Sequence, residues 1–115
     1  MKLIEVKMIL EVAVLNVVTG KEAEFEAAFH QASKVIAETH GYICHQLQRC
    51  IENQSQYILL VNWVSLEDHT HGFRGSVQYQ EWRALLHHFY DPFPIVEHYT
   101  MIMENRAQEF WRNPV

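Results

Sequence analysis

The chain has 115 residues, enough for one domain, and its 49% hydrophobic and 20% charged residues are typical of a soluble globular protein. A formal net charge of -5, with nine scattered Lys and Arg residues, argues against a nucleic-acid partner. No apolar run is long enough to cross a bilayer, and charged residues interrupt the N-terminal segment, so neither a membrane span nor a signal peptide is predicted. We therefore expect a cytoplasmic protein.

A strand over 9–17 and a helix after it are the first predicted elements. The strand is apolar on both faces, which indicates that each face is covered. Thr19-Gly20-Lys21-Glu22 has the spacing of a capping box, in which Thr19 accepts from the Glu22 amide. The helix runs to about His40, and Gly41 stands where a left-handed cap is expected. Its apolar residues recur at helical spacing: Phe25, Ala28, Phe29, Ala32 and Ile36.

A hairpin and a second helical region come next. Strands are predicted over 42–51 and 57–64, and the second is so apolar that we place it in the centre of a sheet. The following helix starts with a capping box at Ser65, is interrupted by two glycines and restarts at Ser76. Asp91-Pro92-Phe93-Pro94 ends it, and a fourth strand is predicted over 95–103.

The order strand-helix-strand-strand-helix-strand predicts an α+β, ferredoxin-like fold, with two helices on one face of a four-stranded antiparallel sheet. We interpret residues 1–115 as one domain, with a core over about 8–103 and a tail over 104–115. Two helices cover only one face, so the strands predict a homodimer whose sheets stack face to face. Phe110 and Trp111 would clasp the partner.

Cysteine and histidine spacing gives little support for a metal site. Cys44 and Cys50 lie too far apart along one strand to bridge, so we expect two reduced, partly buried thiols. His69 and His71 could chelate a metal together only in extended backbone. No metal and no other cofactor is predicted.

Residues 66–99 are the strongest candidate for a site, because they contain five of the eight histidines, two arginines and many aromatic residues. Titratable groups between large rings are typical of a pocket for a flat organic molecule. His69 lies four residues before Phe73, on the helix face that looks at the sheet. It is either satisfied by a strand hydroxyl or carbonyl, or it is a general base with a reference pKa of about 6.5.

His98 and Arg74 complete the predicted catalytic set. His98 shares its strand face with Val96, which we expect to look at the helices, where His98 would form a proton-relay pair with His69. On the opposite face it would be a structural hydrogen-bonding residue. Arg74 lies between Gly72 and Gly75, whose freedom would let the guanidinium turn into a cleft and bind an anion. The alternative is a surface clamp to a carboxylate such as Glu97.

Five further residues are substrate-binding candidates, each with a structural alternative: Asn62, Trp63, Phe73, Trp82 and Arg83. Asn62 interrupts an apolar strand, so its amide needs either a neighbour or a ligand. The three aromatic residues suit core packing as well as a substrate wall. Arg83 either points into the cavity or pairs at the surface with Glu81 or Asp91.

The chain resembles the dimeric α/β-barrel proteins of the antibiotic biosynthesis monooxygenase family over about residues 8–103. The resemblance is carried by the first strand with Thr19-Gly20, by Trp63 before Ser65, and by the tract HTHGFRGS...YQEWR...F...PIVEHY. This tract looks most like an uncharacterised bacterial branch of the family.

The resemblance implies several activities. Some members oxygenate phenolic polyketides without metal or flavin, some degrade heme with an Asn, a Trp and a His, and others act on small signal or quinone-like molecules. The heme set would fall on Ala13, Phe73 and Arg83, which do not match, so heme binding or degradation is disfavoured.

The favoured reading is a cofactor-independent monooxygenase of a small phenolic or quinol-like substrate. His69 or His98 would take the phenolic proton, and Arg74 would stabilise the anion. The alternative is a non-catalytic small-molecule-binding or stress-response dimer.

Overall fold

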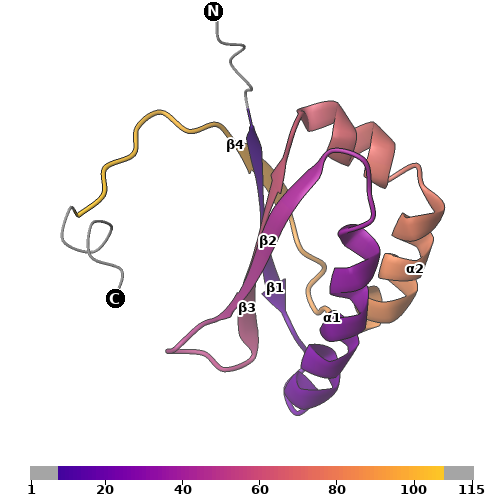
Figure 1. Ribbon diagram of the computed structural model, residues 1–115. Coiled ribbons are helices and arrows are strands. Elements are labelled where there is room, and N and C mark those ends of the chain that lie inside the picture. Colours follow the sequence, from indigo (N-terminus) through magenta and orange to yellow (C-terminus); the bar gives the residue numbers. More distant parts are fainter. Residues whose placement is uncertain (1–7, 108–115) are drawn as a thin grey trace, which may run out of the picture.

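The computed structural model describes residues 8–107 and has the predicted α+β, ferredoxin-like architecture (Figure 1). In chain order the elements are β1 (Ile9–Asn16), α1 (Glu22–Ile36), β2 (Tyr42–Arg49), β3 (Gln56–Trp63), the π-helical turn η1 (Asp68–Phe73), α2 (Val77–Leu86), the 3-10 turn η2 (His87–Phe89) and β4 (Val96–Tyr99). Within the described range, no helix is both long and apolar enough to span a membrane.

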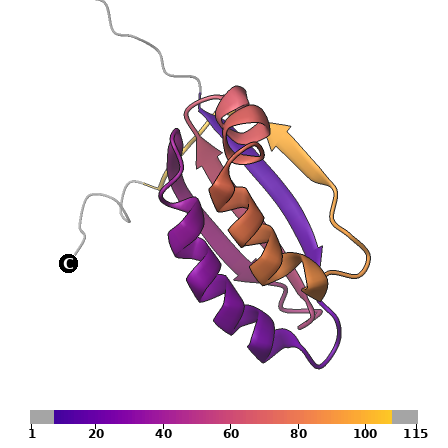
Figure 2. The same cartoon turned by 90° about the vertical axis from the view of Figure 1, so that its right-hand side faces the viewer.

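The four strands form one antiparallel sheet in the order β2-β3-β1-β4, so β3 is central as predicted. Both helices lie on the same face of this sheet (Figure 2). Glu11 of β1 pairs with Val61 of β3 on one side and with His98 of β4 on the other. This register places a carboxyl and an imidazole side by side on neighbouring strands.

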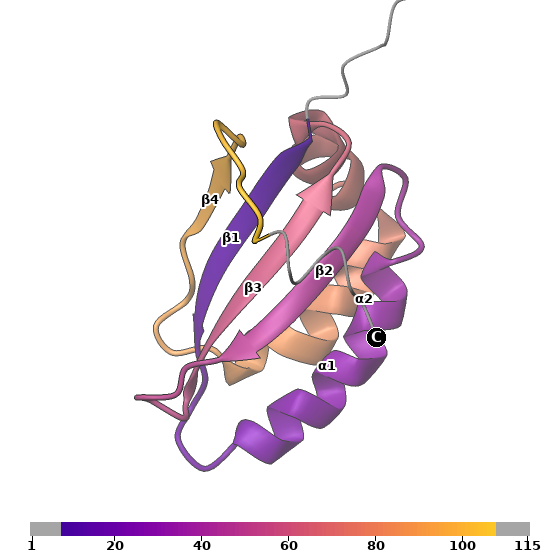
Figure 3. The same cartoon turned by 60° about the vertical axis from the view of Figure 1, so that its left-hand side comes forward.

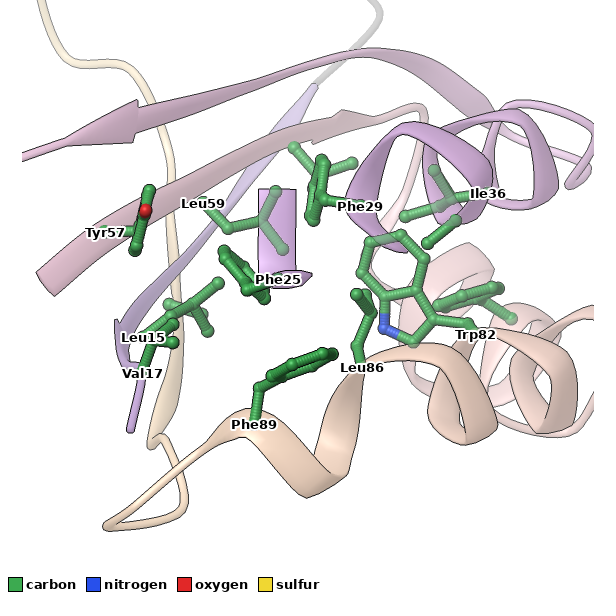
Figure 4. Packing of buried hydrophobic residues seen from close by; sticks show 14 of the residues in the cluster. Leu15, Val17, Phe25, Phe29, Ile36, Tyr57, Leu59, Trp82, Leu86 and Phe89 are labelled. Carbon is green, nitrogen blue, oxygen red and sulfur yellow. The ribbon is translucent and has the colours of Figure 1, made fainter. Parts of the chain in front are cut away.

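An apolar core fills the space between the sheet and the helices (Figure 4). Phe25 and Ala32 of α1 and Leu86 of α2 are completely buried, and they pack toward alternate residues of β1 and β3. Alternation along β1 buries Ala13, Leu15 and Val17 on this face. Glu11 alternates in step with Ala13 and Leu15, so its charged side chain points to the same face of the sheet.

The ends of α1 differ from the prediction. The helix begins after Lys21, and no side chain caps it, because Gly20, at φ +92°, turns the chain between Thr19 and the helix. The predicted capping box is therefore not formed, and Glu22 Oε1 instead accepts from the Gly20 amide at 2.9 Å. The helix ends at Ile36 rather than near residue 40, since the amides of Glu38 and Thr39 bond only three residues back. Gly41 has the predicted positive φ, at +83°.

The predicted caps at Ser65 and Ser76 are present. Ser65 Oγ accepts from the Asp68 amide at 3.2 Å, and Ser76 Oγ accepts from the Tyr79 amide at 3.1 Å. Between them the chain forms the wide turn η1 instead of an interrupted α-helix. The amide of Arg74 donates to the His69 carbonyl, five residues back, at 3.2 Å.

Strand β4 is shorter than the predicted 95–103. Tyr99 pairs with Leu10, so only Ile9 of β1 lies beyond this pair, too little for β4 to continue to residue 103. Strand β2 also ends early, at Arg49 rather than 51. Phe110 and Trp111, the expected clasp on a partner, lie outside the described residues.

Figure 3 shows the side of the sheet opposite the helices, here called the outer face. Many of the side chains on this face are apolar. It is formed by Leu10, Val12 and Val14 of β1, Ile58, Leu60 and Asn62 of β3, and Tyr99 of β4. Val14 is 39% exposed and Tyr99 is 50% exposed. Both helices lie on the other side, so they leave this apolar face open.

Candidate active site

A cavity of about 380 Å³ lies between the sheet and the α2 side of the molecule. Tyr79, Trp82, Tyr90 and Phe93 form the aromatic part of its wall, and Pro94 and aliphatic side chains form most of the rest. Two charged residues, Glu11 and Arg74, line the same space. A cavity with apolar walls and a few polar groups suits a small flat molecule.

Glu11 is the central residue of the site, and it was not among the predicted candidates. The residue is 6% exposed. Its Oε1 accepts from the indole Nε1 of Trp63 at 2.9 Å and lies 3.2 Å from His69 Nε2. In residues 8–107 only Thr39 Oγ1 is a fully enclosed side-chain polar atom without a partner. Glu11 Oε2 has no partner either, so it must be open to the cavity.

His69 stands behind Glu11 and uses both ring nitrogens. Its Nδ1 lies 2.8 Å from His98 Nε2, and its ring stacks on Trp63 with centroids 5.3 Å apart. A carboxyl and an imidazole therefore satisfy this buried histidine, in place of the strand hydroxyl or carbonyl that was one expectation. His98 lies on the helix-facing side of β4 with Val96, as expected.

The cavity lining drawn from the described residues includes Glu11 but neither His69 nor His98. The predicted bases His69 and His98 therefore do not face this cavity directly, and the imidazole at its wall is that of His87. The structure instead gives a chain of three groups, with Glu11 at the cavity, His69 in the middle and the half-buried His98 at the end.

Burial controls the protonation states of these three side chains. It raises the pKa of Glu11 to about 7, although the Trp63 hydrogen bond and the Arg74 charge act in the opposite direction. Burial also lowers the pKa of His69 to about 3, and Arg74 and His98 add to that shift. The pKa of His98 is lowered by burial and by Arg74. His69 is therefore neutral near pH 7, and its Nε2 lies 3.2 Å from Glu11 Oε1 as a close polar contact rather than an ion pair.

Two arrangements of the protons fit the row formed by Glu11, His69 and His98. A neutral imidazole donates through one nitrogen and accepts through the other. When His69 carries its proton on Nε2, which lies 3.2 Å from Glu11 Oε1, its Nδ1 accepts from His98. When Glu11 carries the proton on Oε1, His69 instead donates through Nδ1 to His98. Reversal moves one proton between Glu11 and His98, so the chain can connect the cavity with the half-buried edge of the sheet.

Arg74 follows η1 and lines the cavity. In the part of the chain described here it forms no ion pair with Glu97, so the predicted surface clamp is absent. Gly72 and Gly75 do not have the positive φ that was expected of them. The close approach at Gly75 is present, because a Cβ there would lie 2.7 Å from the His71 carbonyl oxygen.

The other candidates divide into three groups. Trp82 lines the cavity. Trp63 and Phe73 are buried behind it, with ring centroids 5.7 Å apart, and Trp63 holds Glu11. Asn62 and Arg83 are not at the cavity. Asn62 lies on the outer face and donates to Cys44 Sγ at 3.4 Å, whereas Arg83 is exposed on α2.

Tyr90 and His87 also line the cavity and were missed as site residues. Burial and the Glu11 charge raise the pKa of Tyr90, so its hydroxyl stays protonated and can donate. The sequence carried one signal for Glu11, namely a carboxylate in phase with the buried Ala13 and Leu15.

No group of three or more His, Cys, Asp or Glu within residues 8–107 is placed to hold a metal ion. Cys44 and Cys50 are both free thiols, and Cys44 is exposed. Glu11 with His69 behind it offers proton transfer, and Arg74 offers stabilisation of an anion.

Known proteins share both the sequence and the fold. The Bacillus subtilis (strain 168) protein YczJ, which is uncharacterised, is 56% identical over 92 residues, covering 80% of this chain and 97% of its own. A solved structure from Bordetella bronchiseptica, named for the antibiotic biosynthesis monooxygenases, is 35% identical with a TM-score of 0.81 and covers 84% of this chain and 99% of its own.

A more distant likeness extends the fold comparison. SnoaB, a cofactor-independent oxygenase from Streptomyces nogalater, has a TM-score of 0.63 at 19% identity, covering 87% of this chain and 96% of its own. Residues 8–85 match the family model described as antibiotic biosynthesis monooxygenase. With this match and with two relatives above 30% identity, the chain belongs to the antibiotic biosynthesis monooxygenase family.

Proposed function

We propose that this protein is a cofactor-independent monooxygenase acting on a small phenolic or quinol-like aromatic substrate. The observation that supports it most is the open carboxylate oxygen of Glu11, which faces an aromatic-walled cavity with a histidine chain behind it. Family membership and the fold shared with SnoaB agree with this reaction class.

The reaction begins when Glu11 Oε2 takes the phenolic proton. Arg74, at the same cavity, stabilises the phenolate. The electron-rich ring then reduces dioxygen, so that one oxygen atom enters the ring to give a quinone and the other leaves as water with two substrate hydrogens. A single positioned base accelerates a reaction on the order of 10²–10⁴-fold, so the substrate itself must be reactive toward dioxygen.

His69 and His98 act as positioning residues in this scheme. His69 fixes the Glu11 carboxyl through Oε1 and connects it to His98, which can exchange the proton with solvent. Trp63 holds the same oxygen, and Trp82 forms part of the wall against which the substrate ring packs.

The protein is further proposed to be a homodimer in which two outer faces stack. An exposed apolar sheet face of this kind is a common protein–protein contact, and two helices cannot cover it. The cavity lies on the opposite side of the sheet, so both copies would keep their own site.

Oxygen uptake with 1-naphthol and hydroquinones tests the reaction, with quinone absorbance as the product signal. We expect Glu11→Gln to lose at least about 100-fold in rate, because it removes the base but retains an oxygen for Trp63. Glu81→Gln, an exposed site on α2, is the matched control and should keep the full rate. Ligand binding without any oxygen uptake would replace the proposal with the non-catalytic binding dimer.

A further inference from the structure

A second cavity, of about 420 Å³, lies between α1 and β2, the strand at one edge of the sheet, and is here called the α1 cavity. Among the described residues, none lines both this space and the cavity at Glu11. The two spaces are therefore separate sites, and the reaction proposed at Glu11 makes no use of the α1 cavity.

Helix α1 and strand β2 supply most of the lining. The α1 side chains lie three, four and seven residues after the first, so they share one side of the helix: Glu26, Phe29, His30 and Ser33. The β2 side chains are alternate residues of the strand: His45, Leu47 and Arg49. Phe29 is buried, whereas His30 and Arg49 are exposed, so the space has an apolar floor and an open polar rim.

An ion pair at this rim leaves hydrogen-bonding groups unused. Arg49 Nη1 lies 3.1 Å from Glu26 Oε2, and the Tyr57 hydroxyl donates to the same oxygen at 2.6 Å. Glu26 Oε1 has no partner in residues 8–107, and the ion pair does not use Nε or Nη2 of Arg49. The Glu26 and Arg49 side chains are 42% and 48% exposed, so a ligand can reach both charges.

His45 adds a neutral donor to the same cavity. Burial lowers the pKa of His45, so its ring is neutral near pH 7, and the Tyr42 hydroxyl lies 2.5 Å from its Nδ1. Burial also raises the pKa of Tyr42, so the hydroxyl keeps its proton and can donate to Nδ1. The ring then carries its own proton on Nε2, which has no partner in the described part of the chain and can donate to a ligand oxygen.

The floor of the α1 cavity suits a large apolar group. The rings of Phe29 and His45 have centroids 5.9 Å apart, and Leu47 and the buried Tyr57 complete this side of the space. Such a floor packs well against an aromatic or a branched aliphatic side chain.

We propose that the α1 cavity binds a free α-amino acid with a large apolar side chain. The ammonium group of this ligand contacts Glu26 Oε1, and its carboxylate contacts Arg49 and His45. Its side chain packs on Phe29 and Leu47.

The paired charges of the rim favour a zwitterion over a ligand with one charge. An α-amino acid carries its ammonium and carboxylate groups on one carbon, so the two charges are as close together as those of an ion pair. A simple carboxylic acid would place a second anion beside Glu26, and a simple amine would place a second cation beside Arg49. These like-charge contacts disfavour both alternatives.

Isothermal titration calorimetry with three matched ligands tests this proposal on the wild-type protein. L-phenylalanine carries both charges, 3-phenylpropionate lacks the ammonium group, and phenethylamine lacks the carboxylate. We expect L-phenylalanine to bind with a Kd below about 1 mM and each analogue to bind at least about 10-fold more weakly.

Substitutions at the rim locate the two charged contacts. Glu26→Gln, which keeps an oxygen for the Tyr57 hydroxyl, and Arg49→Gln should each weaken L-phenylalanine at least about 10-fold. In Glu26→Gln, L-phenylalanine should also lose its advantage over 3-phenylpropionate, because the ammonium group no longer has a partner. Glu24→Gln on α1 and Arg83→Gln on α2 are exposed controls that should keep the wild-type Kd.

A wild type that does not bind L-phenylalanine would overturn the proposal, and so would an analogue that binds as tightly as the amino acid. Glu11→Gln should keep the wild-type Kd, and a loss of binding in that folded variant would place the ligand in the other cavity and also overturn the proposal. If a rim variant does not fold, as judged by circular dichroism, the three ligands on the wild type still decide the question.

Discussion

Glu11 carries a carboxyl group in an almost solvent-free position, and only Trp63 and His69 replace the lost water. Both contacts fall on one oxygen, Oε1. The burial cost therefore falls on the charged form, and the folded protein keeps the proton to a higher pH than the unfolded chain does. Because of this difference in pKa, the free energy of unfolding depends on pH through Glu11.

Glu11 should lower the stability of the protein as pH rises. The unfolded chain releases this proton near pH 4.5, and the folded chain releases it near pH 7. The stabilising contribution is therefore fully present below pH 4.5 and is lost as pH rises through 7. At about 1.4 kcal/mol per pKa unit, the loss totals about 3 kcal/mol.

His69 acts in the opposite direction, since its folded pKa of about 3 makes stability fall as pH drops below 6.5. The difference in the free energy of unfolding between wild type and Glu11→Gln isolates the contribution of the glutamate. In urea unfolding from pH 5 to 8, the wild-type advantage over Glu11→Gln should decline steadily. An advantage that is constant or grows with pH would show that Glu11 is not buried in this way, and Glu81→Gln should show no such trend.

Trp63→Phe should raise the pKa of Glu11 still further. The indole N–H donates to Oε1 and favours the charged carboxylate, so its removal leaves the effect of burial opposed only by the Arg74 charge. The protonated-carboxyl band in infrared difference spectra measures this, with Glu11→Gln in the same background as the blank. Trp82→Phe removes an indole from the cavity wall but leaves that hydrogen bond, so its titration should match wild type. A lower pKa in Trp63→Phe would contradict the assignment.

Sequence reasoning could place His98 but not Asn62. His98 alternates in phase with Val96 on a strand with one apolar side, and that phase correctly predicted its face. Strand β3 is apolar on both faces, so its pattern did not say which side of the sheet Asn62 occupies. Asn62 and Trp63 are adjacent in a strand and must point to opposite faces, so only one could be near the cavity.

The turn η1 assembles the site at the element scale. Its wide π-helical geometry places His69 against Glu11, while the residue that follows the turn, Arg74, reaches the cavity. Such turns are often found at functional sites. The tight packing of Gly75 against His71 fixes how the chain leaves the turn.

Gly75→Ala should destabilise the protein, and Gly72→Ala should not. A Cβ on Gly75 would lie 2.7 Å from the His71 carbonyl oxygen, a backbone atom that cannot move alone. We expect a cost of about 1–3 kcal/mol in urea unfolding. A Cβ on Gly72 would meet only the Glu67 carbonyl, at 3.7 Å, and alanine favours helical backbone by up to about 1 kcal/mol. Equal effects of the two changes would contradict this account of the turn.

Element order was predictable because periodicity and caps are local. Ser65 and Ser76 begin their helical segments where the sequence places them. Strand ends were less predictable, since the length of β4 depends on where β1 starts rather than on its own residues. Likewise, nothing local distinguished the turn η1 from an α-helix, because its width depends on the fit of His69 and Phe73 to the sheet.

At the scale of the whole molecule, the two faces of the sheet have different tasks. The helix-facing side holds the core and the cavity, whereas the outer face presents apolar side chains with no helix over them. Val12 and Leu60 pair across β1 and β3 near the middle of that face. In a two-fold dimer, such central residues would lie close to their own copies.

Leu60→Lys should therefore convert a dimer into a monomer. Two copies of the new ammonium group would be brought together at the centre of an apolar interface, where neither finds a partner charge, and burying them costs several kcal/mol. Light scattering coupled to size exclusion, over a range of protein concentrations, measures the mass. Gln80→Lys adds the same charge on the exposed side of α2 and should leave the dimer intact. Circular dichroism establishes that both variants fold. A monomeric wild type, or a Leu60→Lys variant that remains dimeric, would show that the outer face is not where two copies meet. Because the cavity lies on the other side of the sheet, neither result would decide whether Glu11 acts as a base.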